Sequence, residues 1–331
     1  MDYQSIRIAV EEGDALEWKA DVLALKYAQA PYGVDRAVLE GYERKGINVK
    51  GKLPKPSGFL IFDSHGVTNT GKVLFIGVNP LHQFGYSEIR QFGRKVLISL
   101  AGEAPDTTNI ALTIHGPGYG LDEVEAFESE IAGIIDGVSS GDIPARLREI
   151  TILERNVARA ARLSEVLLQI IPDGKIPPPG TSTEKSLGER ATERLRSVGY
   201  SSSSKPNIFI AMPFTEDLDD LYHYGIQGAV NAAGFLCERA DLSSFTGDVM
   251  SWVKERIKSS SLVIAELSGA NPNVYLEVGY AWGCGRPTIL LARDSSELKF
   301  DTKGQRCLVY TKIKDLEQSL HQELSNLRDQ L

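Results

Sequence analysis

Residues 262–292 of the chain read LVIAELSGANPNVYLEVGYAWGCGRPTILLA, and they specify a strand, a loop, a helix and a second strand. The apolar run at 262–267 has the length and composition of a buried strand, and the SGANPN segment after it supplies turn and helix-capping residues. We expect a helix from about Asn273 and a second buried strand at 288–292. Because this helix is apolar on every side except at Glu277, the sequence predicts a buried helix whose single carboxyl group must be satisfied or used.

Glu277 is therefore the first candidate catalytic residue. In an open α/β sheet, the carboxyl end of a strand and the start of the next helix form the usual ligand crevice. A carboxyl group buried there has a raised pKa and can act as a nucleophile or as an acid/base. The alternative is a structural glutamate that accepts hydrogen bonds from a loop or pairs with Arg239, Arg286 or Arg306.

Three segments carry a resemblance to a known family: IFIAMPF at 208–214, AELSGANPNVYLEVGYAWGCGRPTILL at 265–291 and FDTKGQRCLVY at 300–310. They resemble the nucleoside 2-deoxyribosyltransferase-like superfamily, a flavodoxin-like group that neighbours the TIR domains. In that family a glutamate in an E-[LIV]-G-[YR]-A helix attacks the anomeric carbon of a nucleoside or nucleotide. The matching residues here are Glu277-Val278-Gly279-Tyr280-Ala281, and the resemblance covers residues 205–322.

The chain departs from the family pattern at the other acidic positions. Many relatives carry aspartate where this chain has Glu266, and the second family aspartate is matched only by the candidates Asp248 and Asp241. The resemblance implies three catalytic candidates, which are Glu277, Glu266 and Asp248. The predicted substrate-binding residues are Ala211, Met212, Pro213, Phe214, Tyr224, Asn271, Asn273, Tyr280 and Arg306.

These substrate-binding candidates have distinct chemical reasons. The loop after the first strand of this region, residues 211–214, allows a ligand close to the backbone, although an ordinary turn has the same composition. Asn271 and Asn273 can hydrogen-bond a sugar or phosphate, and the two tyrosines can stack on or orient a substrate. Arg306 either meets a phosphate or pairs with Asp301.

Composition limits the class of protein. The chain has 331 residues, a net charge of −8 and a pI of 5.3, which suits two acidic domains and argues against nucleic-acid binding. It contains neither an 18-residue apolar run nor a signal-peptide core, so we expect no membrane span and a cytoplasmic location. The three cysteines, Cys237, Cys284 and Cys307, lack metal-ligand spacing, and we expect reduced structural thiols, no metal and no cofactor.

A second candidate ligand site lies in the N-terminal region. The sequence Gly116-Pro117-Gly118-Tyr119-Gly120 falls between a predicted strand and a predicted helix at 121–138, where free backbone amides favour an anion such as phosphate. A tight turn without a ligand uses the same glycines. Acidic residues of the following helix would oppose an anion, and we expect them on its solvated face; they are Asp122, Glu123, Glu125, Glu128 and Glu130.

The opening of the chain resembles a second family. Gly13-Asp14-Ala15 followed by Ala20-Asp21-Val22-Leu23, together with TIHGPGYG at 113–120, resembles macro domains and the N-terminal domain of leucyl aminopeptidases. Macro domains bind ADP-ribose and related nucleotides. An asparagine-rich segment of those domains is replaced here by LALKYAQAPYG, so binding and a purely structural role both stay open. The candidate N-terminal ligand residues are Asp14, His115, Gly116, Pro117, Gly118, Tyr119 and Gly120.

The predicted fold class is α/β, with a macro-like α/β layer domain followed by a flavodoxin-like parallel-sheet domain. We expect the first domain at residues 1–140 and the second at 207–331. Residues 141–206 are predicted to form a helical connector, with helical periodicity from Ile143 to Ile171, and a flexible Pro/Ser-rich linker. The apolar stripe of the connector needs a partner, which predicts a homo-oligomer.

These features lead to two hypotheses of function. The first is an N-glycosidase that acts on a nucleotide, either NAD or a (deoxy)nucleotide, with a nucleotide signal bound by the first domain. By analogy, such a pairing suggests a bacterial antiviral defence effector. The second is a nucleotide sensor or scaffold without catalysis. Release of a base from NAD, nucleosides or deoxynucleotides separates the two.

Overall fold

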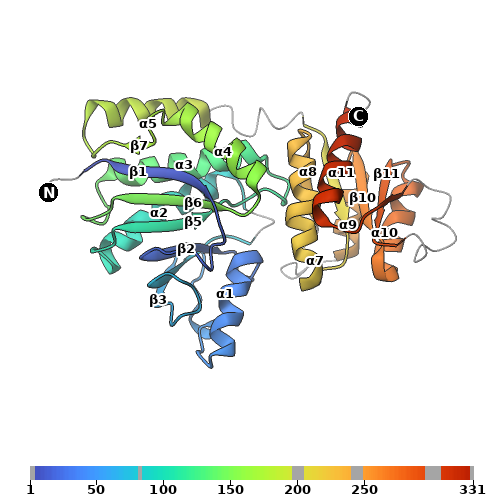
Figure 1. The fold of residues 1–331 in the computed structure, drawn as a ribbon, viewed down its shortest axis with the longest axis horizontal. Coiled ribbons are helices and arrows are strands. Elements are labelled where there is room, and N and C mark those ends of the chain that lie inside the picture. Colours follow the sequence, from blue (N-terminus) through green and yellow to red (C-terminus); the bar gives the residue numbers. More distant parts are fainter. Residues whose placement is uncertain (1–3, 81–83, 196–204, 240–248, 295–306, 329–331) are drawn as a thin grey trace. The chain divides into compact units, whose positions relative to one another are not determined.

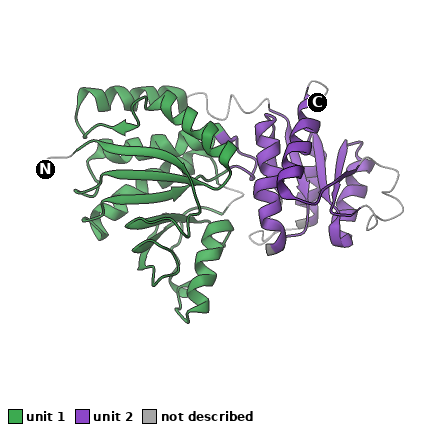
Figure 2. Cartoon of the chain, viewed as in Figure 1, with its two compact units in different colours: residues 1–116, 124–199 green, residues 117–123, 200–331 purple. Residues whose placement is uncertain are grey.

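The computed structural model describes residues 4–80, 84–195, 205–239, 249–294 and 307–328. The chain forms two compact units, coloured separately in Figure 2. The first unit comprises residues 1–116 and 124–199, and the second comprises residues 117–123 and 200–331. The short segment 117–123 therefore belongs to the second unit, although its neighbours on both sides in the sequence belong to the first.

The first unit contains a seven-stranded mixed sheet in the order β3-β4-β2-β5-β6-β1-β7 (Figure 1). The five inner strands run parallel, and β3 and β7 pair antiparallel at the two ends. The strands are β1 (Ile6–Glu12), β2 (Val22–Tyr27), β3 (Phe59–Asp63), β4 (Lys72–Gly77), β5 (Asn109–Thr113), β6 (Glu149–Glu154) and β7 (Lys175–Ile176).

Helices connect these strands, as the alternation in the sequence predicts. They are α1 (Gly33–Arg44), α2 (Tyr86–Glu103), α3 (Glu123–Ser140), α4 (Val157–Ile170) and α5 (Ser182–Leu195), with the 3₁₀ turn η1 (Lys50–Lys52). On one face of the sheet, Leu23 and Leu25 pack with Tyr42 of α1. Helices α2 and α3 approach closely at Gly133, because a Cβ there would lie 1.9 Å from the Arg90 carbonyl oxygen.

The second unit contains a parallel five-stranded sheet in the order β12-β11-β10-β8-β9. Its strands are β8 (Asn207–Ala211), β9 (Leu236–Arg239), β10 (Leu262–Glu266), β11 (Thr288–Ala292) and β12 (Cys307–Val309). Its helical elements are α7 (Glu216–Asp220), the π-helix η3 (Leu221–Ile226), α8 (Gln227–Ala232), α9 (Val249–Ser259), the 3₁₀ turn η5 (Ser268–Ala270), α10 (Pro272–Gly283) and α11 (Ile313–Leu327). In chain order the strands lie as 5-4-3-1-2, which is the flavodoxin-like arrangement.

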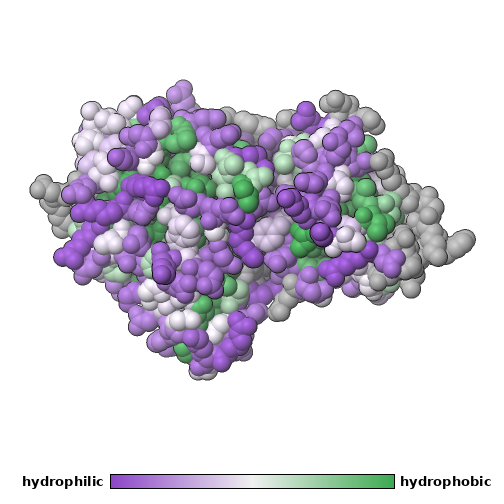
Figure 3. Space-filling model, in the orientation of Figure 1, coloured by the Kyte–Doolittle hydropathy of each residue, from purple (hydrophilic) through white to green (hydrophobic). Residues whose placement is uncertain are grey.

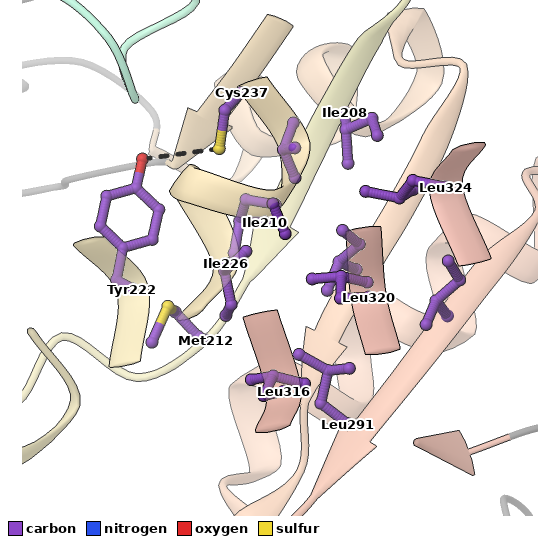
Figure 4. Close-up of a cluster of buried hydrophobic side chains, with 14 of the residues drawn as sticks. Ile208, Ile210, Met212, Tyr222, Ile226, Cys237, Leu291, Leu316, Leu320 and Leu324 are labelled. Carbon is purple, nitrogen blue, oxygen red and sulfur yellow. Dashed lines mark hydrogen bonds between the residues drawn. The ribbon is translucent and has the colours of Figure 1, made fainter. Parts of the chain in front are cut away.

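Alternating residues of β8 supply the two cores of this unit. Ile208 and Ile210 pack with η3, α8 and α11, and Figure 4 shows this cluster around Leu316 and Leu320. Phe209 and Ala211, which lie two residues apart, point to the opposite face and pack with α9 and α10. Both faces of the parallel sheet are thus covered by helices. The predicted α/β fold class, with two units and a flavodoxin-like parallel sheet in the second, is confirmed.

The prediction of a helix from Ile143 to Ile171 is wrong over residues 149–154, which form β6. This strand lies between β1 and β5 and pairs in parallel with both. The residues Ile150, Thr151 and Ile152 are β-branched, which favours a strand. The helical spacing of apolar residues predicted for 143–171 comes mainly from α4, which follows this strand. Within that helix, Leu163, Leu167 and Ile170 are buried.

Two further expectations about exposure are corrected. The acidic residues expected on a solvated face are all buried; they are Asp122, Glu123, Glu125, Glu128 and Glu130. Two of them pair with cations, Glu128 with Arg194 and Asp122 with Lys205, which reduces the cost of their burial. Helix α10 is not buried all round, because the Leu276 side chain is 57% exposed on its outer face.

The surface in Figure 3 is mostly hydrophilic, with small apolar areas scattered among polar side chains. In the part of the chain that the structure describes, no helix is long and apolar enough to cross a membrane.

Candidate functional site

The carboxyl ends of β8 and β10 form the centre of the candidate site. These adjacent parallel strands are the point at which the strand order of the second sheet reverses, and such a point is where open α/β sheets bind ligands. Ala211 pairs with Ala265. The next residues, Met212 and Glu266, therefore lie side by side at the ends of adjacent strands. The structure thus places the predicted residue Met212 beside Glu266.

Glu266 is completely buried, and its carboxyl group is hydrogen-bonded. Its carboxyl accepts hydrogen bonds from the Ser268 amide at 3.2 Å, the Ser268 hydroxyl at 2.5 Å and the Tyr310 hydroxyl at 3.0 Å. The same Ser268 oxygen accepts a hydrogen bond of 2.8 Å from the Arg293 amide. The ends of β10, β11 and β12 are therefore joined through one buried carboxyl group. The catalytic assignment of Glu266 stays a prediction.

Tyr310 and Arg293 complete this network. Burial, followed by the negative charge of Glu266, raises the pKa of Tyr310 to about 12, so its hydroxyl keeps the proton that it donates. A hydrogen bond between Arg293 and the Tyr310 hydroxyl raises the pKa of the guanidinium. Sequence reasoning missed Ser268, Tyr310 and Arg293, and only the position of Ser268 directly after the strand could have indicated one of them.

Glu277 lies in α10, which follows β10 directly. Asn271 caps this helix through a 2.9 Å hydrogen bond from the Asn273 amide, so the capping chemistry read from the sequence is used as expected. With a rise of about 1.5 Å per residue, Glu277 lies about 8 Å along the axis from the first residue of the helix. It therefore sits more than one turn away from the strand ends.

The carboxyl group of Glu277 is half-buried, and this burial raises its pKa to about 7. Within the described residues it makes neither a hydrogen bond nor an ion pair. Among the described residues, two of the three arginines do not pair with Glu277: Arg239 pairs with Asp219, and Arg286 forms no ion pair with the Glu277 carboxyl. Arg306 lies outside the described residues. A carboxyl with a pKa near neutrality suits acid/base or nucleophilic chemistry.

The neighbouring side chains show which way Glu277 faces. Val274, Val278 and Ala281 of α10 are buried against the sheet, so Glu277 lies on the flank that it shares with Tyr280. The Lys254 ammonium of α9 lies 5.8 Å from the centre of the Tyr280 ring. This flank therefore faces α9.

The other predicted residues of this unit have varied surroundings. Met212 is buried in the core, Pro213 is half-buried and Phe214 is exposed. The Arg239 guanidinium lies 5.4 Å from the Phe214 ring centre. Tyr224 is half-buried in η3, whose wider π-helical turn is a feature frequent at functional sites. The catalytic candidate Asp248 and the alternative Asp241 lie outside the described residues.

The glycine loop predicted to bind an anion is engaged elsewhere. Gly116 ends the first segment of the first unit, and residues 117–120 belong to the second. The Gly120 amide donates to the Cys237 carbonyl oxygen at 2.9 Å, and Gly118 accepts from the Arg239 amide at 3.2 Å. An anion could use the Gly120 amide only by displacing the Cys237 carbonyl. The anion site at this loop stays a prediction.

His115 lies in a buried polar cluster at the carboxyl ends of β2 and β5. Its ring packs edge-on against the Phe92 ring, with 4.6 Å between the two ring centres. Within the described residues, its Nε2 atom lacks a hydrogen-bond partner. Burial, and then the nearby Lys26 charge, lower its pKa well below 6.5, so the ring is neutral. Lys26 forms a buried ion pair of 3.6 Å with Asp35. A neutral imidazole can accept a hydrogen bond but does not attract an anion.

Glu130 belongs to the same cluster and was assigned to the surface from its sequence. It is fully buried, and burial raises its pKa to about 8, against smaller opposite effects from the His115 backbone and Lys26. Sequence reasoning missed Lys26 and Asp35 and did not place Glu130 in a polar cluster. The only local sign was a lysine inside the apolar strand LALKY.

The two aspartates of the N-terminal resemblance have structural contacts. Asp14 accepts a hydrogen bond of 2.9 Å from the Leu16 amide and lies 3.6 Å from Arg155. Asp21 accepts bonds of 2.7 Å from the amide and the hydroxyl of Thr108 and a longer one from Asn109. Burial opposes ionisation of Asp21, but these bonds outweigh it and lower the pKa. Asp21 thus fixes the start of β5 beside that of β2.

Comparisons with known proteins find structural similarity to macrodomains at low sequence identity. No protein-family model and no curated protein matches the chain. Solved structures similar to it include a macrodomain from Oceanobacillus iheyensis with MES bound, at 16% identity over 50% of this chain and 91% of that one, with a TM-score of 0.37. A mutant of that macrodomain with ADPR covers 50% of this chain and 93% of its own at 14% identity, with a TM-score of 0.36.

Proposed function

We propose that the second unit is an N-glycosidase that acts on a nucleotide, either NAD or a (deoxy)nucleotide, with Glu277 as the catalytic carboxylate. One observation carries the proposal. The Glu277 carboxyl is half-buried, has a pKa of about 7 and lacks a hydrogen bond or ion pair within the described residues. It also occupies the helix that follows a strand of the topological switch.

The chemistry asks little of the protein. Hydrolysis breaks the bond between the anomeric carbon and the base nitrogen, and water supplies a hydroxyl to the carbon and a proton to the base. Positive charge develops on the sugar as the base departs, and a carboxylate on one face either stabilises this charge or attacks the carbon. The proposal assigns this task to ionised Glu277. The exposed amide of Asn273 and the Tyr280 ring lie on the same flank of α10 and can contact the sugar or the base.

Glu266 has a different role in the proposal. Ser268 and Tyr310 donate hydrogen bonds to its carboxyl, so we propose that it positions the strand ends and does not touch the sugar. The proposal further includes a nucleotide signal bound by the first unit and a role in bacterial antiviral defence. Both follow from the pairing of the two resembled families.

Base release tests the proposal. The full chain is incubated with NAD, adenosine, AMP and dAMP, with and without ADP-ribose, and the free base is measured by chromatography. We expect release by the wild type and a loss of about two to three orders of magnitude in Glu277→Gln, as expected for one principal electrostatic group. Glu317→Gln is the matched control, because Glu317 is a half-buried helical glutamate in α11, on the opposite face of the sheet.

Two outcomes would count against the proposal. Base release by folded Glu277→Gln at the wild-type rate would remove Glu277 from the reaction. Nucleotide binding by the wild type without base release under any condition would favour the sensor or scaffold hypothesis.

A further inference from the structure

The edge of the second sheet is covered by a segment from another part of the chain. Residues 117–121, here called the edge segment, lie along β9, which is the end strand of the sheet. Tyr119 and Glu238 form an antiparallel bridge. The Gly120 amide donates to the Cys237 carbonyl, and the Gly118 carbonyl accepts from the Arg239 amide. An open strand edge is a site for pairing, and this segment occupies it.

Only glycine fits at position 118 of the edge segment. Gly118 has φ of +91°, and a Cβ there would lie 2.6 Å from the Tyr222 hydroxyl and 2.8 Å from the Gln227 side-chain nitrogen. The Tyr222 hydroxyl donates to the Gly118 carbonyl at 2.6 Å. Just beyond the edge segment, Asp122 forms an ion pair with Lys205. The backbone hydrogen bonds to β9, the close fit of Gly118 and the Asp122–Lys205 ion pair therefore all favour the docked position.

A series of contacts leads from the edge segment to the β8 exit loop. Tyr222 is fully buried, and its hydroxyl also lies 3.9 Å from the Cys237 sulfur, as Figure 4 shows. The Arg239 guanidinium lies 4.0 Å from the Tyr222 ring centre and 5.4 Å from the Phe214 ring centre. Arg239 is buried and lies near two aromatic rings. The Tyr222 ring carries the hydroxyl that binds Gly118, and the Phe214 ring belongs to residues 212–214.

We propose that docking of the edge segment on β9 fixes the β8 exit loop through Tyr222 and Arg239. When the segment leaves β9, the Tyr222 hydroxyl loses its acceptor and Arg239 loses a backbone partner, so the stack on Phe214 loosens. The inference rests on the proposed function only in taking residues 212–214 as the substrate side. The edge segment thereby becomes a regulatory element for that side of the site.

Peptide-resolved hydrogen exchange of the full chain tests this without any substrate. We expect Gly118→Ala to accelerate exchange in both β9 and residues 208–214 by at least about tenfold, with β11 unchanged. Gly285→Ala is the control, because Gly285 has φ of +68° and a Cβ there meets no atom within 4 Å. The control adds similar backbone strain but removes no contact with the edge segment.

Tyr222→Phe provides an independent arm in case Gly118→Ala does not fold. It removes the hydroxyl that binds Gly118 but keeps the ring that contacts Arg239, and we expect a smaller acceleration in the same two regions. Acceleration in β9 with unchanged exchange in residues 208–214 would overturn the proposal, as would no change in either region. Failure of base release in the wild type would remove the proposed function without altering this readout.

Discussion

Glu130 gives the sharpest prediction about the first unit. The perturbation is Glu130→Gln, which keeps the volume of the side chain and removes its ability to ionise. Burial raises the Glu130 pKa from the ordinary value of 4.5 to about 8 in the folded protein. Between these two values the folded state holds a proton that the unfolded chain releases, so the stability of the wild type falls as the pH rises.

The size of the effect follows from the two pKa values. The slope is about 1.4 kcal/mol per pH unit, and the interval from 4.5 to about 8 gives a total loss of roughly 5 kcal/mol. His115 acts with the opposite sign, because its lowered pKa makes stability rise with pH up to 6.5. The two effects oppose each other below pH 6.5, and the net decline from this pair falls between pH 6.5 and 8. Buried Asp35 also has a raised pKa and adds to the fall at the acidic end.

The difference between wild type and variant isolates Glu130, because His115 and Asp35 contribute equally to both. The assay is hydrogen exchange in urea at pH 5, 6, 7 and 8, corrected for intrinsic rates and measured on peptides of β5 and α3. We expect the free energy of unfolding of Glu130→Gln to rise relative to that of the wild type by about 1.4 kcal/mol per pH unit up to pH 8. Glu189→Gln, on an exposed position of α5, is the control and should run parallel to the wild type. Parallel curves for Glu130→Gln and the wild type would refute the reasoning.

Three further predictions concern both units. The rate of base release by the wild type should rise with pH through about 7 and then level off, because the proposed role of Glu277 requires its ionised form; a rate that falls over this range would contradict that role. Gly133→Ala should destabilise the first unit by about 1 to 3 kcal/mol in urea unfolding, because its Cβ meets α2, whereas Gly102→Ala, with open space around it, should not. Glu266→Gln should lower the stability of the second unit by about 1 to 3 kcal/mol, because the new amide N–H group would face groups that donate hydrogen bonds to the carboxyl in the wild type. A thermal melting temperature equal to that of the wild type would contradict this. Removal of only the Tyr310 hydroxyl, in Tyr310→Phe, should cost less than the Glu266 change.

Local signals predicted the second unit well. The expected strand at 262–267 is β10 (Leu262–Glu266), and the strand expected at 288–292 is β11 (Thr288–Ala292). The helix expected from about Asn273 starts at Pro272 with Asn271 as its cap. Each of these elements is specified by residues next to one another, namely an apolar run, a breaker segment and a capping side chain.

Contacts between distant residues could not be predicted in the same way. Residues 149–154 form a strand because β1 and β5 pair with them on both sides, and the apolar spacing alone fits a helix equally well. The edge segment is bound by Tyr222 and by β9, more than a hundred residues later in the chain. The same glycine-rich sequence suits an anion-binding loop and a segment paired with a strand. Only its contact with β9 distinguishes the two.

The two glutamates of the central stretch show what the structure adds to the motif. From the sequence, Glu266 and Glu277 are both acidic residues in apolar surroundings, and both are catalytic candidates. The donors that engage Glu266 come from Ser268 and Tyr310, so its buried carboxyl is satisfied and serves the architecture. Glu277 keeps a raised pKa without such donors within the described residues. An uncompensated carboxyl is costly to retain, and sites that break a local rule of stability are where function is expected. For this reason we propose that Glu277 carries the chemistry and that Glu266 holds the strand ends beside it.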